Sequence, residues 1–439
     1  MDSKSPEQKL LDRRQRVLRS LRQYYDVPFH PVRGQGQWLY DAAGHRYLDA
    51  YNNVPHVGHC HPHVVEALCR QAATLNTNTR YLFEPILEYA ERLIATMPPG
   101  LSACMFTCTG SEANDLAWRL ATTFTGGTGA ITTERAYHGN TTFLDSIDGS
   151  SIKTNRAAAD WWGTVPPPRF SAFATPHEEQ DQAKEYARHF TSVVDALTAR
   201  GHRPAAFIFD TYFCADGVYL PPSGFMRNAV AEVRKARALV IADEVQAGLG
   251  RSGSHLWSVQ RLGIDPDIVV MGKPMGNGHP IGVVVARQEI IDTFYSRDRY
   301  FNTFAGNPVS CAVGSAVLDV VERQNLQENA RKVGGRMKQS IEELTKKHEI
   351  IGDVRGQGLL LGIELVLDRE TRLPAGDEAR WVINEMCRRG VLIGLTGPNR
   401  KARNVLKIRP PMVFDEEGLG LLIGTLDTTL TAMRGQFRR

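Results

Sequence analysis

Short apolar segments alternate with segments of helical pattern from about residue 56 to residue 310, and this alternation constrains the fold most strongly. The apolar segments read ACMFT, GAITT, AAFIFD, ALVIAD and DIVVMG. They have the length of strands, and they are apolar throughout, as strands covered on both faces are. Helical segments such as EANDLAWRLATTF and FMRNAVAEVRKAR stand between them. The pattern predicts an α/β fold, in which helices flank a mostly parallel sheet.

The sequence on either side of this region has a different pattern of expected helices and strands. A chain of 439 residues fits one large domain and one small domain. Residues 1–55 predict an N-terminal arm, in which a helix precedes short strands and GQWLYDAAGHRYLDA has the pattern of a hairpin. After Asn307, helical segments lead to strands around VRGQGLLLGIELV, VLIGLTG and NVLKIRPPMVF. We therefore expect a large domain over 56–310 and a smaller α+β domain over 311–439.

Charge and composition narrow the class of protein. The 52 Lys and Arg residues nearly balance 48 Asp and Glu residues, and no basic block is strong enough to indicate nucleic acid. The stretch KLLDRRQRVLRSLRQ favours a solvated amphipathic helix over a transit peptide, because Asp12 interrupts it. No apolar run approaches the roughly 18–20 residues of a membrane span. Seven scattered cysteines without a CxxC pair indicate reduced thiols, and hence a cytoplasmic protein.

Polar residues stand after three of the apolar segments, where parallel strands end and ligands bind. Gly110 and Ser111 follow ACMFT and begin a helical segment. The amide groups there favour an anion, although an ordinary helix cap explains the same residues. Asp243 ends ALVIAD. A buried carboxylate needs a partner, which is either a cofactor's ring nitrogen or a structural cation or amide.

Lys273 follows the third segment, DIVVMG, and precedes a loop that is rich in Gly and Pro and contains no other cation. A lysine that is desolvated in such a pocket becomes a nucleophile toward an aldehyde. Read alone, one lysine after one strand is more usually a surface lysine in a loop. Thirty residues separate Asp243 from Lys273, enough for a loop, a short helix and the next strand. The two side chains therefore face one ligand from neighbouring strand ends. Together with the anion site, they predict pyridoxal 5′-phosphate (PLP), held as a Schiff base on Lys273.

Five motifs extend this interpretation to a family. They are TGSEAN at 109–114, AYHG at 136–139, ADEVQ at 242–246, GKPMGNGHPIG at 272–282 and NTFAGNP at 302–308. In order and spacing the chain resembles the class III aminotransferases, or ω-aminotransferases, of PLP fold type I over nearly its full length. NNVPHVGHCHP, LNTNTRYL and NVLKIRPPMVF more closely resemble the phospho-lyases that act on phosphoethanolamine and phosphohydroxylysine, and their bacterial relatives named aminotransferases.

The resemblance implies a role for each residue of these motifs. Lys273 resembles the Schiff-base lysine that moves the proton, and Asp243 resembles the partner of the pyridine nitrogen. Tyr137 would stack on one face of the ring, Val245 would pack under the other, and Gln246 would approach the ring oxygen.

The phosphate contacts imply an assembly. Gly110 and Ser111 would hold the phosphate of the chain's own cofactor. Thr303 is similar to the threonine that reaches the phosphate of the neighbouring subunit's cofactor, which implies a homodimer with shared active sites.

The substrate side departs from the family's usual pattern. Many relatives carry Arg three residues before the Pro-Pro of the last motif, where this chain has Lys407, and Arg409 lies two residues further on. Lys is a point charge that lacks the bidentate fork of Arg. Asp210 takes the place of a Glu that many relatives use with Arg as a gate for a second carboxylate substrate. Asn53 and Arg80 complete the candidate substrate residues, and an ion pair at the surface or an interface is the alternative for Arg80.

Two further segments leave alternatives open. The closely spaced histidines of HVGHCHPH are typical of a metal-binding cluster. The resemblance favours a turn beside the cofactor instead, so we expect no metal. Residues 150–182 are irregular and predict an insertion or an active-site loop. Within them, Trp161 and Trp162 either wall a substrate pocket or fill a gap in the dimer interface.

The expected function is that of a PLP enzyme acting on a primary amine or amino acid through a carbanion. An aminotransferase is favoured, and a phospho-lyase that eliminates phosphate and ammonia from an amino-alcohol phosphate is the alternative. Oxidative decarboxylation by O₂ ranks third, because the same carbanion serves all three reactions. A non-enzymatic PLP-binding protein is disfavoured, because Lys273 and Asp243 are both present.

Overall fold

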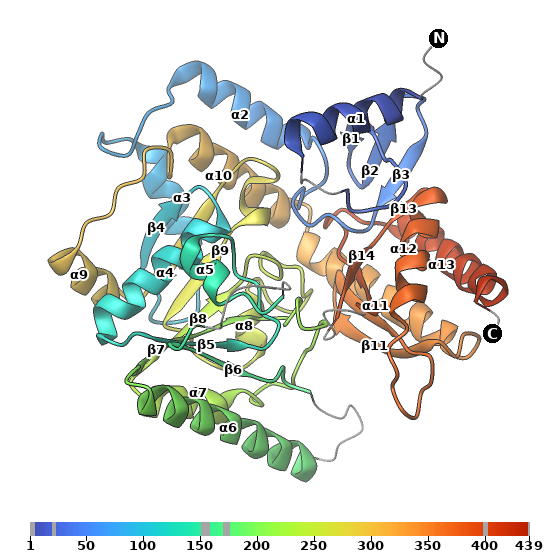
Figure 1. The fold of residues 1–439 in the computed structure, drawn as a ribbon. Coiled ribbons are helices and arrows are strands. Elements are labelled where there is room, and N and C mark those ends of the chain that lie inside the picture. The colour runs from blue at the N-terminus through green and yellow to red at the C-terminus, as the bar shows by residue number, and fades with distance from the viewer. Residues whose placement is uncertain (1–4, 20–22, 151–158, 170–175, 398–402, 438–439) are drawn as a thin grey trace.

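A computed structural model describes residues 5–19, 23–150, 159–169, 176–397 and 403–437 (Figure 1). Its centre is a seven-stranded sheet of order β4-β10-β9-β8-β7-β5-β6. The strands are β4 (Ala103–Thr107), β5 (Gly129–Thr133), β6 (Trp162–Val165), β7 (Pro204–Asp210), β8 (Leu239–Asp243), β9 (Ile268–Met271) and β10 (Gly282–Ala286). Neighbours are parallel, except that β10 runs antiparallel to β4 and β9. The predicted α/β fold with a mostly parallel sheet is confirmed.

Helices cover both faces of this sheet. They are α2 (Pro62–Thr74), α3 (Glu84–Ala95), α4 (Gly110–Thr125), α5 (Thr142–Ser146), α6 (Pro176–Ala199), α7 (Arg227–Lys235), α8 (Ser258–Arg261), the 3₁₀ turn η1 (Lys273–Gly276), α9 (Gln288–Arg297) and α10 (Pro308–Arg323). Alternate side chains of a strand point to opposite faces. Ile208 and Ile241 therefore pack in the cluster of α4 and α9, and Phe207 and Val240 pack in that of α6 and α7.

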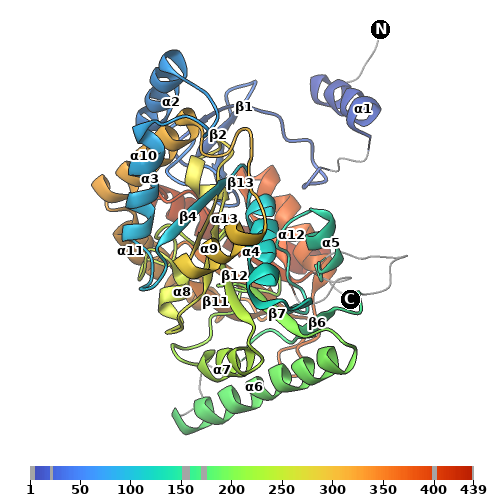
Figure 2. The same ribbon diagram turned by 90° about the vertical axis from the view of Figure 1, so that its left-hand side faces the viewer.

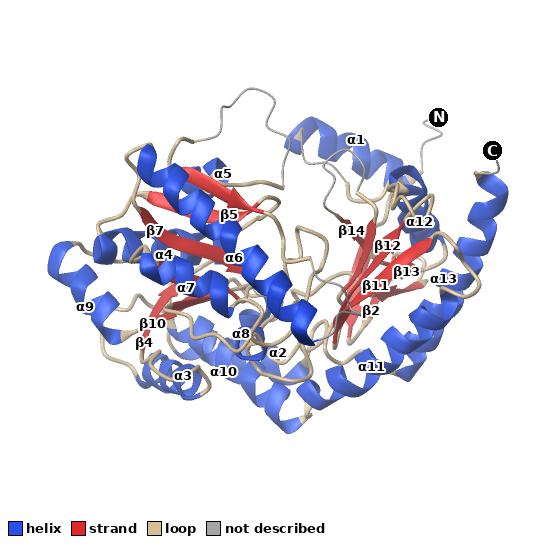
Figure 3. Cartoon of the chain, turned by 90° about the horizontal axis from the view of Figure 1, so that it is seen from below, coloured by secondary structure: helices blue, strands red, loops and turns tan. Residues whose placement is uncertain are grey.

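The C-terminal part forms a second, four-stranded sheet of order β11-β12-β15-β14. Its strands are β11 (Ile351–Gln357), β12 (Leu360–Leu365), β14 (Gly394–Thr396) and β15 (Val405–Ile408), and its helices are α11 (Leu326–Leu344), α12 (Gly376–Arg388) and α13 (Glu416–Gln436). Seen from below, the central and C-terminal sheets lie on opposite sides of the molecule with helices around them (Figure 3). The domain boundary at 310/311 remains a prediction; α10 runs through that point and packs on α2 and α3.

The N-terminal arm adds a third sheet. Its strands are β1 (Pro31–Gln35), β2 (Trp38–Asp41) and β3 (Arg46–Asp49), joined by β13 (Val391–Leu392) from the C-terminal part. The helix α1 (Pro6–Leu18) buries no side chain and stands apart from the body in Figure 2. The solvated helix and the hairpin predicted for this arm are both present. Among the described residues, no helix is long and apolar enough to cross a membrane.

Candidate active site

The carboxyl ends of the parallel strands bring the predicted cofactor residues to one edge of the central sheet. Asp210 on β7 and Asp243 on β8 are register partners, and Lys273 comes two residues after β9 ends. A cavity of about 240 Å³ opens there. It is lined by Gly110, Ser111, Tyr137, His138, Gly139, Asp210, Asp243, Val245, Gln246 and Lys273. Of the residues assigned to the cofactor from the sequence, all but Thr303 line this cavity.

Lys273 is half-buried in the wall of the cavity, and its amine is enclosed by the surrounding residues. Burial lowers the pKa of its amine, Arg409 lowers it further, and the carboxylates of Asp243 and Asp210 act in the opposite direction. A lowered pKa leaves more of the amine in its neutral, nucleophilic form. Gly272 sets its position, because a Cβ there would lie 3.1 Å from Cα of Gly110. The end of β9 and the start of α4 therefore meet at backbone contact distance.

Asp243 is held by two side chains that sequence reasoning did not single out. Asn114 Nδ2 donates to Asp243 Oδ2 (2.9 Å), and His138 Nδ1 lies 2.8 Å from the same oxygen. Asn114 also donates to the carbonyl of His138 (2.9 Å), and the amide of Val245 donates to Oδ1 (2.9 Å). The carboxylate is thus fixed in orientation. Asn114 lies in the TGSEAN motif and His138 lies in the AYHG motif, so these motifs could have identified both residues from the sequence.

The first turn of α4 forms the anion cradle. Thr109 Oγ1 accepts from the amide of Glu112 (3.1 Å), and Glu112 Oε2 accepts from the amide of Cys108 (2.8 Å). The first-turn amides of Gly110 and Ser111 have no intrahelical acceptor, as at every helix start. Gly139 brings the AYHG loop onto this turn, since a Cβ at its φ of 147° would lie 2.6 Å from Ser111 Oγ.

The donor set of this cavity fits PLP. The α4 cradle suits a phosphate, the fixed carboxylate suits a ring nitrogen, and the buried amine suits an aldehyde. Val245 lines one part of the cavity wall and Tyr137 another, so that each can contact a flat ring.

A second cavity of about 330 Å³ adjoins the first and shares Tyr137, Gln246 and Lys273 with it. The N-terminal arm contributes Tyr24 and Tyr51 to its wall, and the C-terminal sheet contributes residues from β14 and β15. Besides Lys273, its lining cations are Arg135, Arg403, Lys407 and Arg409. Among the described residues, no carboxylate lines it. The wall is therefore strongly cationic.

The two candidate substrate cations on β15 and just after it differ in their surroundings. Arg409 Nη1 donates to Gln246 Oε1 (2.5 Å) and to Asn53 Oδ1 (3.1 Å), and its guanidinium lies 4.8 Å above the ring of Tyr51. Lys407 is buried, with 8% of its surface exposed, and it lines the cavity. Burial, and then the charge of Arg409, lower the pKa of Lys407 to about 7.

Asp210 serves the backbone rather than Arg409. Its carboxylate accepts from the amides of Tyr212 (2.9 Å) and Cys214 (3.2 Å), with Gln246 Nε2 at 3.5 Å. Burial, and then the charge of Asp243, raise the pKa of Asp210. Asp210 therefore shapes residues 211–219, called the β7 loop below, and the arginine's hydrogen bonds go to Gln246 and Asn53 instead.

Arg80 and Thr303 lie outside both cavities of this chain. Arg80 is exposed, and its guanidinium lies 4.1 Å above the ring of Phe301. Thr303 is exposed beside Phe304.

The two tryptophans of the irregular stretch line neither cavity. Trp161 stacks on Phe143 and lies near Trp118, and Trp162 begins β6 and donates to Thr132 Oγ1 (2.9 Å). Both pack in the core cluster of α4. The rest of this stretch lies partly outside the described residues, which omit 151–158 and 170–175.

The four histidines of HVGHCHPH turn to different partners. His56 bonds the carbonyl of Leu249, His59 bonds Asp49, His61 bonds Gln324 and His63 bonds Asp319. Within the described ranges, no group of three His, Cys, Asp or Glu side chains is placed to hold a metal ion.

Comparison with known proteins gives a consistent answer. The sequence model of the family "Aminotransferase class-III" matches residues 20–430. "Alanine--glyoxylate aminotransferase 2-like" of Drosophila melanogaster is 42% identical, over 93% of this chain and 84% of the relative. "Ethanolamine-phosphate phospho-lyase homolog 1" of Caenorhabditis elegans is 38% identical, over 98% of this chain and 95% of the relative.

Solved structures share the fold. A phospholyase from Arthrobacter in complex with phosphoethanolamine is 40% identical with a TM-score of 0.91, covering 96% of this chain and 99% of that chain. A Bacillus anthracis aminotransferase is 28% identical with a TM-score of 0.87, covering 98% and 100%. The fold is that of PLP fold type I enzymes. The chain belongs to the class III aminotransferases and is a PLP-dependent enzyme that acts on amines.

Proposed function

We propose that this enzyme is a phospho-lyase, which converts an amino-alcohol phosphate such as phosphoethanolamine and one molecule of water into phosphate, ammonia and a carbonyl product. The observation that carries the proposal is the cationic wall of the second cavity, where Arg135, Arg403, Lys407 and Arg409 stand without a lining carboxylate among the described residues. A phosphate monoester carries a charge of about −1.5 to −2 at neutral pH, so it is matched by several cations rather than one.

The cofactor cavity supplies the reactive centre. When bound, PLP supplies an electron sink for the electrons that a substrate C–H bond releases. Lys273 Nζ is placed to take that proton, because it lies in both cavities and its pKa is lowered by burial. Asp243 would hold the ring nitrogen, with its own orientation fixed by Asn114 and His138. The amides of α4 would hold the cofactor phosphate.

The substrate cavity positions the leaving group. Lys407 and Arg135 lie near Lys273 in one cavity, so they hold a substrate phosphate beside the carbon from which the proton leaves. Arg409 is anchored by Gln246 and Asn53, and it adds positive charge without needing to move. These cations stabilise the phosphate as it departs, when its charge grows.

Transamination is the second candidate, and Arg409 favours it. A guanidinium in the substrate cavity binds a carboxylate in a bidentate manner, as an amino-acid or keto-acid substrate requires. The Drosophila relative at 42% identity is named an aminotransferase.

The two reactions differ in what they consume. We would incubate the purified holoenzyme with phosphoethanolamine, and separately with amino acids, each with and without a keto acid, and assay phosphate, ammonia, new amino acid and O₂ uptake. We expect phosphate and ammonia in equal amounts without a keto acid. Turnover that requires a keto acid and releases no phosphate would refute the proposal, and O₂ uptake would point to the oxidative reaction. Lys273→Ala should abolish both turnover and the visible absorbance of the lysine-bound cofactor.

We further propose a homodimer with shared active sites in the cytoplasm. Thr303 supports the dimer, because it is exposed and lies outside the chain's own cofactor cavity. All seven cysteines are free thiols, in keeping with a reducing compartment. Sedimentation of the purified enzyme and fractionation of the source cells test the two statements.

A further inference from the structure

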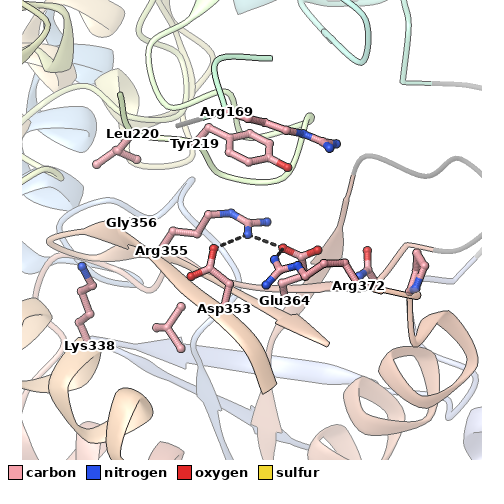
Figure 4. A pocket seen from close by; sticks show the side chains of 12 residues that line it. Arg169, Tyr219, Leu220, Lys338, Asp353, Arg355, Gly356, Glu364 and Arg372 are labelled. Carbon is pink, nitrogen blue, oxygen red and sulfur yellow. Dashed lines mark hydrogen bonds and ion pairs between the residues drawn. The ribbon is translucent and has the colours of Figure 1, made fainter. Parts of the chain in front are cut away.

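A third cavity, of about 590 Å³, lies between the hairpin of β11 and β12 and the end of the β7 loop (Figure 4). It shares no described lining residue with the two catalytic cavities. Its volume falls in the range of about 300–1,000 Å³ that is usual for small-molecule sites. Tyr219, Leu220, Val354 and Pro374 are its apolar and aromatic lining residues, and Tyr219 and Leu220 lie on the same side of it in Figure 4.

The charged side chains of this cavity leave a surplus of positive charge. Four cations line it, Arg169, Lys338, Arg355 and Arg372, against the two carboxylates of Asp353 and Glu364. Figure 4 shows Arg169 beside Tyr219 at one end of the cavity and Lys338 at the other, and the guanidinium of Arg355 lies 4.6 Å from the centre of the Tyr219 ring.

Both carboxylates are already bound to arginine. Arg355 Nη1 donates to Asp353 Oδ2 (2.7 Å) and to Glu364 Oε2 (2.5 Å), and Arg372 Nη2 donates to the same Glu364 oxygen (2.8 Å). The two lining carboxylates are therefore neutralised by Arg355 and Arg372.

The other two cations have no carboxylate partner within the lining. The guanidinium of Arg169 lies 5.8 Å above the ring of Tyr219, and among the described residues no carboxylate lies within ion-pair distance of it. Lys338 Nζ lies 3.8 Å from Glu342, one turn away on α11 and outside the cavity lining. Arg169 thus carries a positive charge that no described lining carboxylate neutralises, beside the wall that Tyr219 and Leu220 form, while Lys338 adds a second positive charge at the other end of the cavity.

We propose that this cavity binds a small organic anion, whose apolar or aromatic body lies against Tyr219 and Leu220 and whose carboxylate or phosphate meets Arg169. The apolar wall supplies burial, Arg169 supplies a charge-assisted hydrogen bond and orientation, and Lys338 adds to the positive charge of the lining. The site is separate from the substrate cavity, and so the inference is independent of the phospho-lyase proposal.

The test is a direct binding measurement on the holoenzyme. The probe is 8-anilinonaphthalene-1-sulfonate, which combines aromatic rings with one anionic group and fluoresces when it enters an apolar site. The site variant is Arg169→Ala with Lys338→Ala, both surface-accessible changes. Its matched control is Arg188→Ala with Lys332→Ala, an exposed arginine on α6 and an exposed lysine on α11. Visible absorbance of the bound cofactor confirms that each variant is folded.

We expect saturable binding of the probe at one site per chain. The site variant should weaken it about tenfold or more, since the charge-assisted contact of Arg169 and the positive charge of Lys338 are lost, while the control and Lys407→Ala bind as the parent does. Leu220→Trp, which fills the cavity and keeps its charges, should also abolish binding. Binding that is unchanged in the site variant and in Leu220→Trp, or lost only in Lys407→Ala, would overturn the proposal. Added benzoate or phenyl phosphate should displace the probe; failure of both would equally count against it.

Discussion

At the scale of single residues, the contacts of Asp243 decide how well the site can hold a ring nitrogen. A carboxylate that is free to rotate loses conformational entropy when it binds, and this loss weakens binding. Asn114, His138 and the amide of Val245 fix both oxygens of Asp243 before any ligand binds. The partners are buried, so water does not compete for these bonds. Removal of one of these hydrogen-bond partners should therefore lower the affinity for the cofactor.

His138→Phe should weaken cofactor binding about 10- to 100-fold, because a hydrogen bond to a charged group contributes roughly 1.5–3 kcal/mol. The measurement is a titration of apoenzyme with PLP, followed by visible absorbance. His45→Phe is the matched control, since the side chain of His45 is 75% exposed. Equal affinity in the two variants would contradict the positioning role of His138.

Lys407 predicts a pH dependence. Its pKa is lowered to about 7, so the free enzyme carries this charge below pH 7 and loses it above. The protonated form binds a phosphate, and kcat/KM for phosphoethanolamine should fall as the pH rises from 7 to 9. In Lys407→Met, kcat/KM at pH 6.5 should be lower than that of the parent by about tenfold or more. The decrease above pH 7 should disappear.

A pH profile of kcat/KM for parent and variant checks this. Lys184→Met, on the exposed surface of α6, should keep the parent profile. A parent profile that stays flat between pH 7 and 9 would show that Lys407 does not titrate in the substrate cavity.

The same scale shows what the sequence could reveal about the site. Lys273 and Gly110 each follow an apolar strand and Asp243 ends one, so a single rule about strand ends places the three residues together. Arg135 also follows a strand, since it comes two residues after β5 ends. The same rule could therefore have predicted its place in the substrate cavity. Tyr24 and Tyr51 were beyond it, because the N-terminal arm reaches the cavity only through tertiary packing.

At the scale of elements, the β7 loop is the part that connects the two sheets. Arg355 on β11 donates from Nε to the carbonyls of Gly217 and Val218 (both 3.0 Å) and from Nη2 to Gly217 (2.9 Å). Within the loop, Asp216 accepts from Thr133 Oγ1 (2.7 Å) and from the amide of Arg135 (3.0 Å). A strand of the C-terminal sheet thereby helps to place a cation of the substrate cavity.

Arg355→Ala should release the loop and lower kcat/KM about tenfold or more, chiefly through KM, because misplacement of a substrate-positioning group is costly. Arg372→Ala is the control, since Arg372 shares the Glu364 contact but makes none of these bonds to the β7 loop. Steady-state kinetics on both variants decides the matter. Equal KM values would mean that the loop keeps its place without Arg355.

Element prediction from the sequence succeeded where the pattern is local. The five apolar segments are strands β4, β5, β7, β8 and β9. EANDLAWRLATTF and FMRNAVAEVRKAR fall in helices α4 and α7, and the helical segments expected after Asn307 are α10 and α11. β6 was missed, because it is a short edge strand inside an irregular stretch. The parallel pairing of β13 with β3 joins residues more than 300 positions apart, and no local pattern encodes such a contact.

At the scale of the whole molecule, exposed apolar side chains gather near Thr303. Leu82 is 101% exposed, and Tyr81 and Phe304 are 66% and 70% exposed. Arg80 lies over the ring of Phe301, so the segments around residues 81 and 303 are neighbours. Large exposed apolar side chains in one area mark an interaction site, and the position beside Thr303 fits a second copy of this chain.

Leu82→Asp should dissociate the proposed dimer, because a charge would be buried in its interface. Sedimentation velocity at several concentrations measures the assembly, and turnover should fall with dissociation if active sites are shared. Val17→Asp on α1, another exposed apolar position, is the control. A dimer that survives Leu82→Asp would place the interface elsewhere.

The β7 loop also has a thermodynamic consequence. One end of it borders the cationic third cavity through Tyr219, and Ala215, four residues earlier, lines the substrate cavity. Two ligands that press on one loop have linked binding free energies, and linkage is reciprocal. By whatever factor an anion in the third cavity alters the affinity for substrate, substrate must alter the affinity for that anion by the same factor.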